Sequence, residues 1–90
     1  MFIERKIMLN KQDIQTKITT LLAEQLQKDV TTLQPAAILK NLGVDELDFI
    51  VFIMAIEESF SLLITDQDLQ DLQTIEDITL CVERLQKRSL

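Results

Sequence analysis

Residues 42–48 read Leu42-Gly43-Val44-Asp45-Glu46-Leu47-Asp48, and this stretch predicts the start of a long helix. Asp45 is a favourable N-cap residue, because its carboxylate can accept a hydrogen bond from an unpaired backbone N–H of the first turn. Asp48 falls at the third helical position, the position that completes a capping box. The apolar residues that follow predict that the helix continues to about Phe60.

The composition of the whole chain favours helices. Its 90 residues are 47% apolar and include one glycine and one proline, so the residues that usually mark turns between strands are nearly absent. This length predicts one small domain. The chain has no histidine and one cysteine, Cys81, which excludes an intramolecular disulfide, a cysteine-rich zinc site and imidazole chemistry. Cys81 lies beside the apolar stripe of the last helix and is expected to be a small buried hydrophobic residue.

Three more helix starts are predicted at polar residues that an aspartate follows three positions later: Asn10, Thr65 and Thr74. They predict helices over about 11–28 and 66–71, and a last helix whose apolar stripe comprises Ile75, Ile78, Val82 and Leu85.

The connection over 29–44 is long and contains Pro35. We expect it to be held on the core by apolar anchors, namely Leu33, Ile38, Leu39 and Leu42. The sequence thus predicts an all-α fold, a small four-helix bundle with three longer helices, a short third helix and a long loop between helices one and two. Residues 10–88 form the predicted domain, and residues 1–9 are predicted to be a flexible N-terminal extension.

Two opposite faces of the predicted helix 46–60 are apolar. At 100° per residue the first face spans about 100° of arc and is a normal core stripe, made of Phe49, Phe52, Ile53, Ile56 and Phe60. The second face contains Leu47, Ile50, Val51 and Met54, with Glu57 and Glu58 one turn further on. Either the long loop covers this second face, or the face is a docking surface for a partner.

Three segments in order resemble carrier proteins. Acyl and peptidyl carrier proteins usually read Leu-Gly-x-Asp-Ser-Leu-Asp where this chain has residues 42–48. The end of the second helix, 55–60, resembles the family's Leu-Glu-Glu-x-Phe pattern, and 64–68 and 72–78 resemble the starts of its third and fourth helices. The resemblance covers about residues 10–87 and identifies the acyl carrier protein family. It implies a four-helix bundle of acyl-carrier-protein type that presents the start of helix two to partner enzymes.

Glu46 stands where the resemblance implies the serine that receives phosphopantetheine from coenzyme A. A carboxylate in that reaction would form an acyl phosphate, which water cleaves readily. We therefore expect no phosphopantetheine on this chain and no other cofactor. Glu46 could be a charge that resembles the modified state, an ordinary first-turn helix residue in a lapsed carrier, or an engineered replacement. The alternative is a genuine acyl carrier protein of fatty-acid or secondary-metabolite biosynthesis whose attachment serine is replaced here by Glu46.

The predicted function is a non-catalytic docking module for proteins of fatty-acid or polyketide-type metabolism. Val51 falls where the family generally has an acid, which makes the recognition helix unusually apolar and favours a stable partner. The predicted docking residues are Asp45, Glu46, Leu47, Ile50, Val51, Met54, Glu57 and Glu58. Their partner would present a basic and apolar surface. A homodimer through this helix is the competing explanation.

Charge is concentrated in the second half of the chain. Residues 41–90 hold eleven Asp/Glu, all between Asp45 and Glu83, and no base lies among them. Such a field repels nucleic-acid phosphates and anionic lipid, so neither a nucleic acid nor a membrane is expected as a partner. No apolar run approaches a membrane span or a signal peptide, so the predicted location is cytoplasmic. The acids lack the loop of a dedicated calcium site, so no metal is expected, and no group for catalysis accompanies them.

Overall fold

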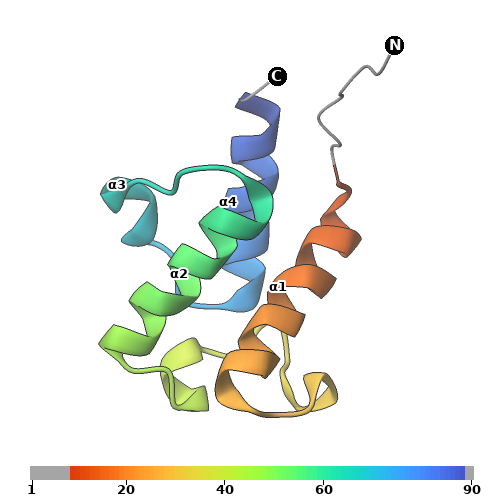
Figure 1. Ribbon diagram of the computed structural model, residues 1–90, viewed down its shortest axis with the longest axis vertical. Helices are drawn as coiled ribbons and strands as arrows, with labels where there is room; N and C mark the ends of the chain where they lie inside the picture. The colour runs from red at the N-terminus through yellow and green to blue at the C-terminus, as the bar shows by residue number, and fades with distance from the viewer. Residues whose placement is uncertain (1–8, 89–90) are drawn as a thin grey trace.

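This computed structural model describes residues 9–88, which contain four α-helices and two short 3-10 turns (Figure 1). The order is α1 (Lys11–Leu26), η1 (Val30–Thr32), η2 (Leu39–Leu42), α2 (Glu46–Phe60), α3 (Asp66–Leu69) and α4 (Ile75–Arg88). The predicted all-α bundle, with three longer helices, a short third helix and a long loop after the first, is confirmed.

Each helix begins one residue after the polar residue predicted to cap it. Asn10 Oδ1 accepts a hydrogen bond of 2.8 Å from the Asp13 N–H at the start of α1. The Thr74 side chain accepts one of 3.0 Å from the Asp77 N–H at the start of α4. Asp45 and Thr65 cap α2 and α3 in the same way. These bonds satisfy backbone donors that the first turn of a helix leaves unpaired.

Two helices end earlier than predicted. α1 stops at Leu26 and not near residue 28, because Gln27 adopts a left-handed conformation with φ 54°. The Gln27 N–H then donates to the carbonyls of Ala23 and Glu24, which closes the last turn. α3 ends at Leu69 and not at residue 71. No glycine marks either end in the sequence, so the predicted boundaries were too long.

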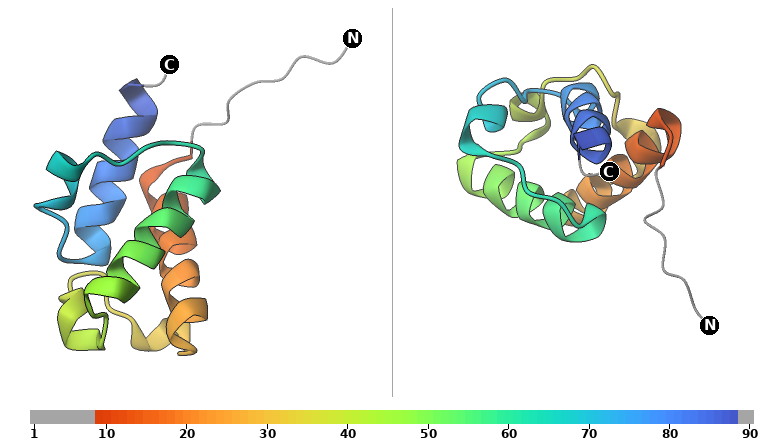
Figure 2. Two further views of the ribbon diagram at one scale, coloured as in Figure 1. Left: turned by 60° about the vertical axis from the view of Figure 1, so that its left-hand side comes forward. Right: turned by 90° about the horizontal axis from the view of Figure 1, so that it is seen from above.

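The core lies between the three long helices. α1 packs against both α4 and α2. Figure 2 shows α3 on the opposite side of the molecule from α1, beside α2 and α4. The predicted stripe of α4 is buried throughout, and so are Phe52, Ile53, Ile56 and Phe60 of α2, with Phe49 half-buried against them. Burial of these apolar faces is the main stabilising contribution to a bundle of this size.

Two of the four predicted anchors of the loop between α1 and α2 are fully buried in the core. Leu33 and Leu39 are buried, and Leu42 is half-buried against the core. Ile38 was wrongly predicted as an anchor: its side chain is 44% exposed. Its backbone instead pairs with Thr74 in an isolated antiparallel bridge, and the neighbouring Leu39 N–H donates to the Gln73 carbonyl at 2.8 Å. The loop is therefore tied to the segment that leads into α4.

The predicted N-terminal extension, 1–9, lies outside the described residues except for Leu9. Leu9 is half-buried against the core, and its N–H donates to the Gln86 side chain at 3.2 Å. Leu9 thus belongs to the bundle and not to the predicted extension. Within residues 9–88, no helix has the length and apolar character needed to span a membrane.

Candidate attachment position and docking surface

The first turn of α2 presents three carboxylates. The Asp45 side chain accepts a hydrogen bond of 2.8 Å from the Asp48 N–H, and Asp48 Oδ2 accepts one of 3.4 Å from the Asp45 N–H. Glu46, the first residue of the helix, is exposed and takes no part in this capping box. Its negative charge is favourable there, because the N-terminal end of a helix carries partial positive charge.

No hydroxyl group lies near Glu46 along the helix. Residues 45–58 include no serine, threonine or tyrosine, and the first hydroxyl is that of Ser59. Thirteen residues along a helix correspond to about 20 Å, so Ser59 lies at the far end of α2. Its carbonyl accepts a hydrogen bond from Lys17 Nζ at 3.1 Å, which ties that end to α1.

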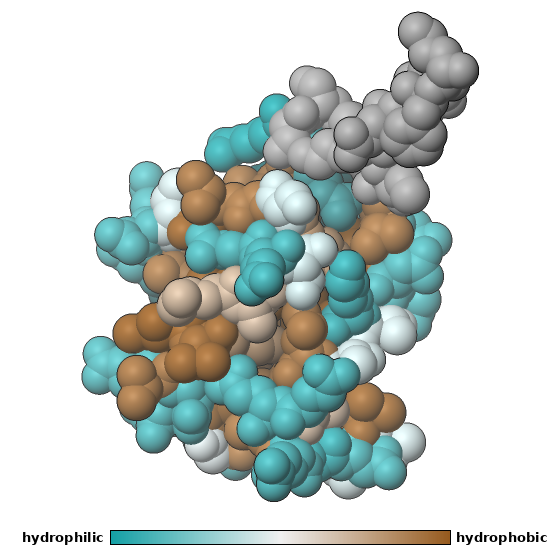
Figure 3. All heavy atoms as spheres, in the orientation of Figure 1, coloured by the Kyte–Doolittle hydropathy of each residue, from teal (hydrophilic) through white to brown (hydrophobic). Residues whose placement is uncertain are grey.

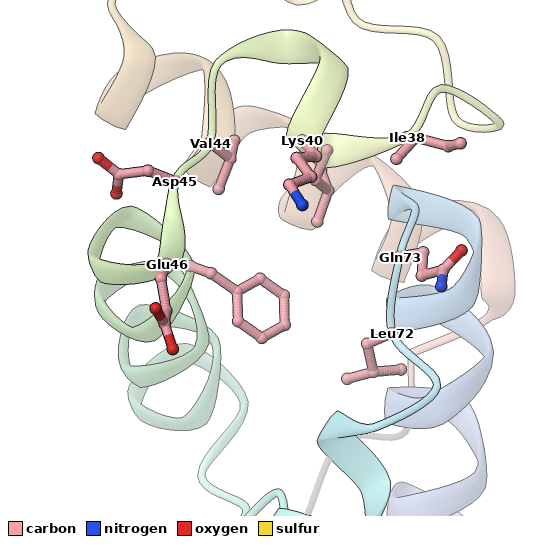
Figure 4. A pocket seen from close by; sticks show the side chains of 9 residues that line it. Ile38, Lys40, Val44, Asp45, Glu46, Leu72 and Gln73 are labelled. Carbon is pink, nitrogen blue, oxygen red and sulfur yellow. The ribbon is translucent and has the colours of Figure 1, made fainter.

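A cavity of about 500 Å³ opens beside Glu46. Side chains from the loop, from the start of α2 and from the segment before α4 line it: Ile38, Leu39, Lys40, Val44, Asp45, Glu46, Phe49, Leu72 and Gln73. In Figure 4 the Lys40 ammonium and Leu72 point into the cavity, whereas the Asp45 carboxylate points away. The cavity can therefore hold an apolar group with a polar end near its rim.

The outward face of α2 is apolar and open. Leu47 is 70% exposed and Met54 60%, and Ile50 and Val51 are each about half exposed. Figure 3 shows apolar side chains gathered over α2. The loop over 29–44 does not cover this face, so that alternative from the sequence does not hold. The role of the face in docking stays a prediction.

The two glutamates near the end of this face differ in their surroundings. Glu58 is exposed to solvent, and its predicted part in docking stays untested. Glu57 is half-buried, and its Oε2 accepts a hydrogen bond of 2.8 Å from the Ile64 N–H. Glu57 thus fixes the segment after α2, a structural role that the sequence did not indicate. Its predicted part in docking stays untested.

Cys81 does not offer another attachment point. Its side chain is only 3% exposed, and burial raises the pKa of the thiol above its ordinary value. Arg84 Nη2 donates to the sulfur at 3.7 Å. A buried thiol of this kind is a core residue, as the sequence predicted.

Several residues of the site were not found by sequence reasoning. Lys40, Phe49 and Leu72 meet at the cavity although they come from three segments. Leu63 is 79% exposed just beyond α2. The neighbouring acids do not assemble into a cation site, because residues 9–88 contain no group of three or more His, Cys, Asp or Glu arranged to hold a metal ion.

Comparison with known proteins identifies the family. A family model described as "Phosphopantetheine attachment site" matches residues 16–82, which is most of the chain. This chain belongs to the acyl carrier protein family. An acyl carrier protein of Syntrophobacter fumaroxidans is 38% identical over 66 residues, which are 72% of this chain and 82% of the relative.

Two further members of the acyl carrier protein family resemble the chain to a similar degree. An acyl carrier protein of Bdellovibrio bacteriovorus is 35% identical over 72 residues, which are 79% of this chain and 92% of the relative. One from Thermosynechococcus vestitus is 34% identical over 71 residues, covering 78% of this chain and 88% of the relative. The likeness therefore extends over most of each protein and not only over the start of α2.

Family membership implies a phosphopantetheine group, which the residues at the start of α2 do not fit. The group is joined through a hydroxyl, and residues 45–58 offer only carboxylates as oxygen nucleophiles. The assignment of Glu46 to the attachment position rests on the motif over 42–48 and stays a prediction. A serine at position 46 would place a hydroxyl at the first residue of α2, beside the cavity.

Proposed function

We propose that this chain has an acyl-carrier-type role in acyl metabolism, in which α2 is the recognition element and position 46 is the attachment position. The observation that carries this proposal is the family match over residues 16–82. The chain also aligns with relatives named acyl carrier protein over 82–92% of their length. These relatives favour a carrier over the non-carrying docking module that the sequence predicted. Under this proposal Glu46 replaces the serine of an otherwise retained carrier.

The second candidate is a docking protein that never bears the arm. One observation favours it: Glu46 is an exposed carboxylate, and no hydroxyl occurs in residues 45–58. A carboxylate that attacked the pyrophosphate of coenzyme A would give a mixed anhydride, which hydrolyses. In this candidate the chain occupies carrier docking sites and transfers no acyl group.

Intact-mass measurement separates the two candidates. The wild-type chain and the Glu46→Ser variant are each incubated with coenzyme A and a broad-specificity phosphopantetheinyl transferase. We expect no mass increase on the wild type and a pantetheine-sized increase on Glu46→Ser, because the transferase then finds both its docking helix and a hydroxyl. An increase on Glu46→Ser alone would support position 46 as the attachment position and would mean that the chain with Glu46 bears no arm, as in the docking candidate, whereas a Glu46→Ser variant that stays unmodified would count against position 46. A pantetheine-sized increase on the wild type would exclude the docking candidate, and it would also contradict the assignment of position 46, since Glu46 has no hydroxyl.

Both candidates use the outward face of α2. In this proposal Leu47, Ile50, Val51 and Met54 form the apolar contact, and the acids at either end orient a partner with a basic surface. The charge pattern disfavours the competing homodimer, since two copies would bring acids against acids. The full predicted set is Asp45, Glu46, Leu47, Ile50, Val51, Met54, Glu57 and Glu58.

The remaining expectations concern activity and location. The family is one of non-catalytic carriers, which supports the prediction that the chain is not an enzyme. A cytoplasmic location and the absence of nucleic-acid and membrane partners stay predictions, which rest on the charge distribution and the lack of long apolar segments.

A further inference from the structure

Leu63 is exposed between two residues that pack against the core. Leu62 is half-buried against the core and Ile64 is buried, whereas Leu63 between them is 79% exposed, the largest exposed fraction among the exposed large apolar residues. A single exposed leucine needs no explanation by itself. Leu63, however, continues the apolar face of α2 beyond the end of the helix.

The segment that carries Leu63 is fixed by three hydrogen bonds. Ser61 caps α2 in a left-handed conformation, φ 52°, and its N–H donates to the Glu57 carbonyl. The Leu62 N–H donates to the same carbonyl at 3.1 Å, and the Ile64 N–H donates to the Glu57 carboxylate at 2.8 Å. Because the backbone is already ordered on both sides of Leu63, binding there would cost little conformational entropy.

A shallow hollow of about 550 Å³ lies between this segment and the end of α2. It is lined by Met54, Glu57, Glu58, Ser61, Leu62 and Leu63. We propose that this hollow receives an apolar side chain of a partner helix that lies along α2, and that Leu63 is a binding residue. This inference rests on the docking surface of the proposed function and adds its second, C-terminal contact.

The length of the face fits one helix of the partner. α2 has 15 residues, which correspond to about 22 Å. Leu47 lies near its start, and Met54 and Leu63 lie at the hollow. A partner helix of about four turns would span this distance and place apolar residues at both ends.

Charge decides between a foreign partner and a second copy of this chain. In a two-fold dimer through α2, Glu58 would face either itself or the acids at the start of the helix, Asp45 and Glu46. Residues 45–58 contain five acids and no base, and the two nearby bases, Lys40 beside Glu46 and Lys17 at the Ser59 carbonyl, offset only part of this charge in a chain of net charge −6. A helix with an apolar stripe flanked by Lys or Arg is complementary to the same surface.

A designed peptide tests the inference on the full chain. The probe is a labelled helical peptide of about 18 residues, with a leucine stripe at helical spacing and lysines beside it. A second peptide replaces the lysines by glutamates. Affinity is measured by fluorescence anisotropy for the wild type, Leu63→Asp, Leu63→Ser and Val30→Asp. Val30 is a matched control because it is 45% exposed and lies in η1 beside α1 residues, away from α2.

We expect Leu63→Asp to weaken binding of the lysine peptide about tenfold or more, because an apolar anchor is lost. Leu63→Ser should weaken it too, and Val30→Asp should leave it within about twofold. Both aspartate variants add the same charge, so a general electrostatic effect would strengthen binding of both. The glutamate peptide should not bind the wild type. Unchanged affinity in both Leu63 variants would overturn the inference.

A double variant separates this inference from the docking surface itself. If Val51→Lys with Met54→Glu abolishes binding while the Leu63 variants retain it, the docking surface stands and the role of Leu63 falls. If none of these changes weakens binding, both fall. Sedimentation of the wild type gives a further check, since a stable dimer that Leu63→Asp dissociates would mean that a second copy occupies the hollow and would overturn the inference.

Discussion

Asp45 and Asp48 cap the start of α2 reciprocally. The Asp48 N–H donates to the Asp45 carboxylate at 2.8 Å, and the Asp45 N–H donates to the Asp48 carboxylate at 3.4 Å. This pair fixes the first turn of α2, and so it fixes the place at which Glu46 leaves the helix beside the cavity. The stability of this turn and the placement of Glu46 therefore depend on the same two side chains.

Replacement of Asp45 by alanine should destabilise the protein by about 1 kcal/mol, within the range of about 0.5–2 kcal/mol for loss of an N-cap side chain. Urea denaturation followed by circular dichroism measures this change. Glu58→Ala is the control, since Glu58 is exposed away from the cap, and it should stay within about 0.5 kcal/mol of the wild type. Equal stabilities of Asp45→Ala and Glu58→Ala would show that the capping box contributes nothing.

Replacement of Glu57 by alanine should release the segment that follows α2. The Ile64 N–H would lose its carboxylate acceptor, and we expect a destabilisation of about 1–2 kcal/mol. Hydrogen exchange gives the local measurement: the Ile64 amide should exchange faster than in the wild type. Glu57→Gln keeps an acceptor oxygen and should have a smaller effect. Unchanged protection of the Ile64 amide in Glu57→Ala would contradict this role.

Asp68 should make stability depend on pH in the acid range. Hydrogen bonds from Thr65 lower the pKa of the Asp68 carboxyl below its usual 3.8, and Arg84, which pairs with it at 2.9 Å, acts in the same direction. Near that pKa the unfolded state binds more protons than the folded state, so stability rises with pH. The contribution is complete above 3.8 and is lost as the pH falls through the lower folded pKa.

The Asp68→Asn variant isolates this effect. Its urea midpoint should lie below that of the wild type well above the usual pKa of Asp68, and the two midpoints should converge as the pH falls below 3.8. A difference that stays constant across this range would mean that ionisation of Asp68 does not stabilise the fold.

Cys81 should be slow to react in the native protein. Its thiol is buried and its pKa is raised by that burial, so little thiolate is available to a thiol reagent. The reaction rate measured with a chromogenic disulfide at neutral pH should increase strongly in denaturing urea. A native rate as fast as the denatured rate would contradict the burial of this side chain.

The sequence alone determined the helix starts and the faces of α2. A cap joins residues three positions apart, as in Asn10 with Asp13, so it depends on local order in the chain and can be read directly. The faces follow from the helical period, which separates Phe52 and Ile56 from Leu47 and Met54. The family resemblance came from the same local segments and is confirmed by the comparisons.

The tertiary structure alone decided what these faces meet. Ile38 is exposed because its backbone pairs with Thr74, and the cavity beside Glu46 forms only where residues 38–49 meet residues 72–73. Leu63 is exposed between Leu62 and Ile64, which pack against the core, and Glu57 accepts a hydrogen bond from the Ile64 N–H. Such contacts join segments far apart in the sequence, and they depend on the packing of the whole bundle. Periodicity and capping, in contrast, depend only on neighbouring turns of the chain.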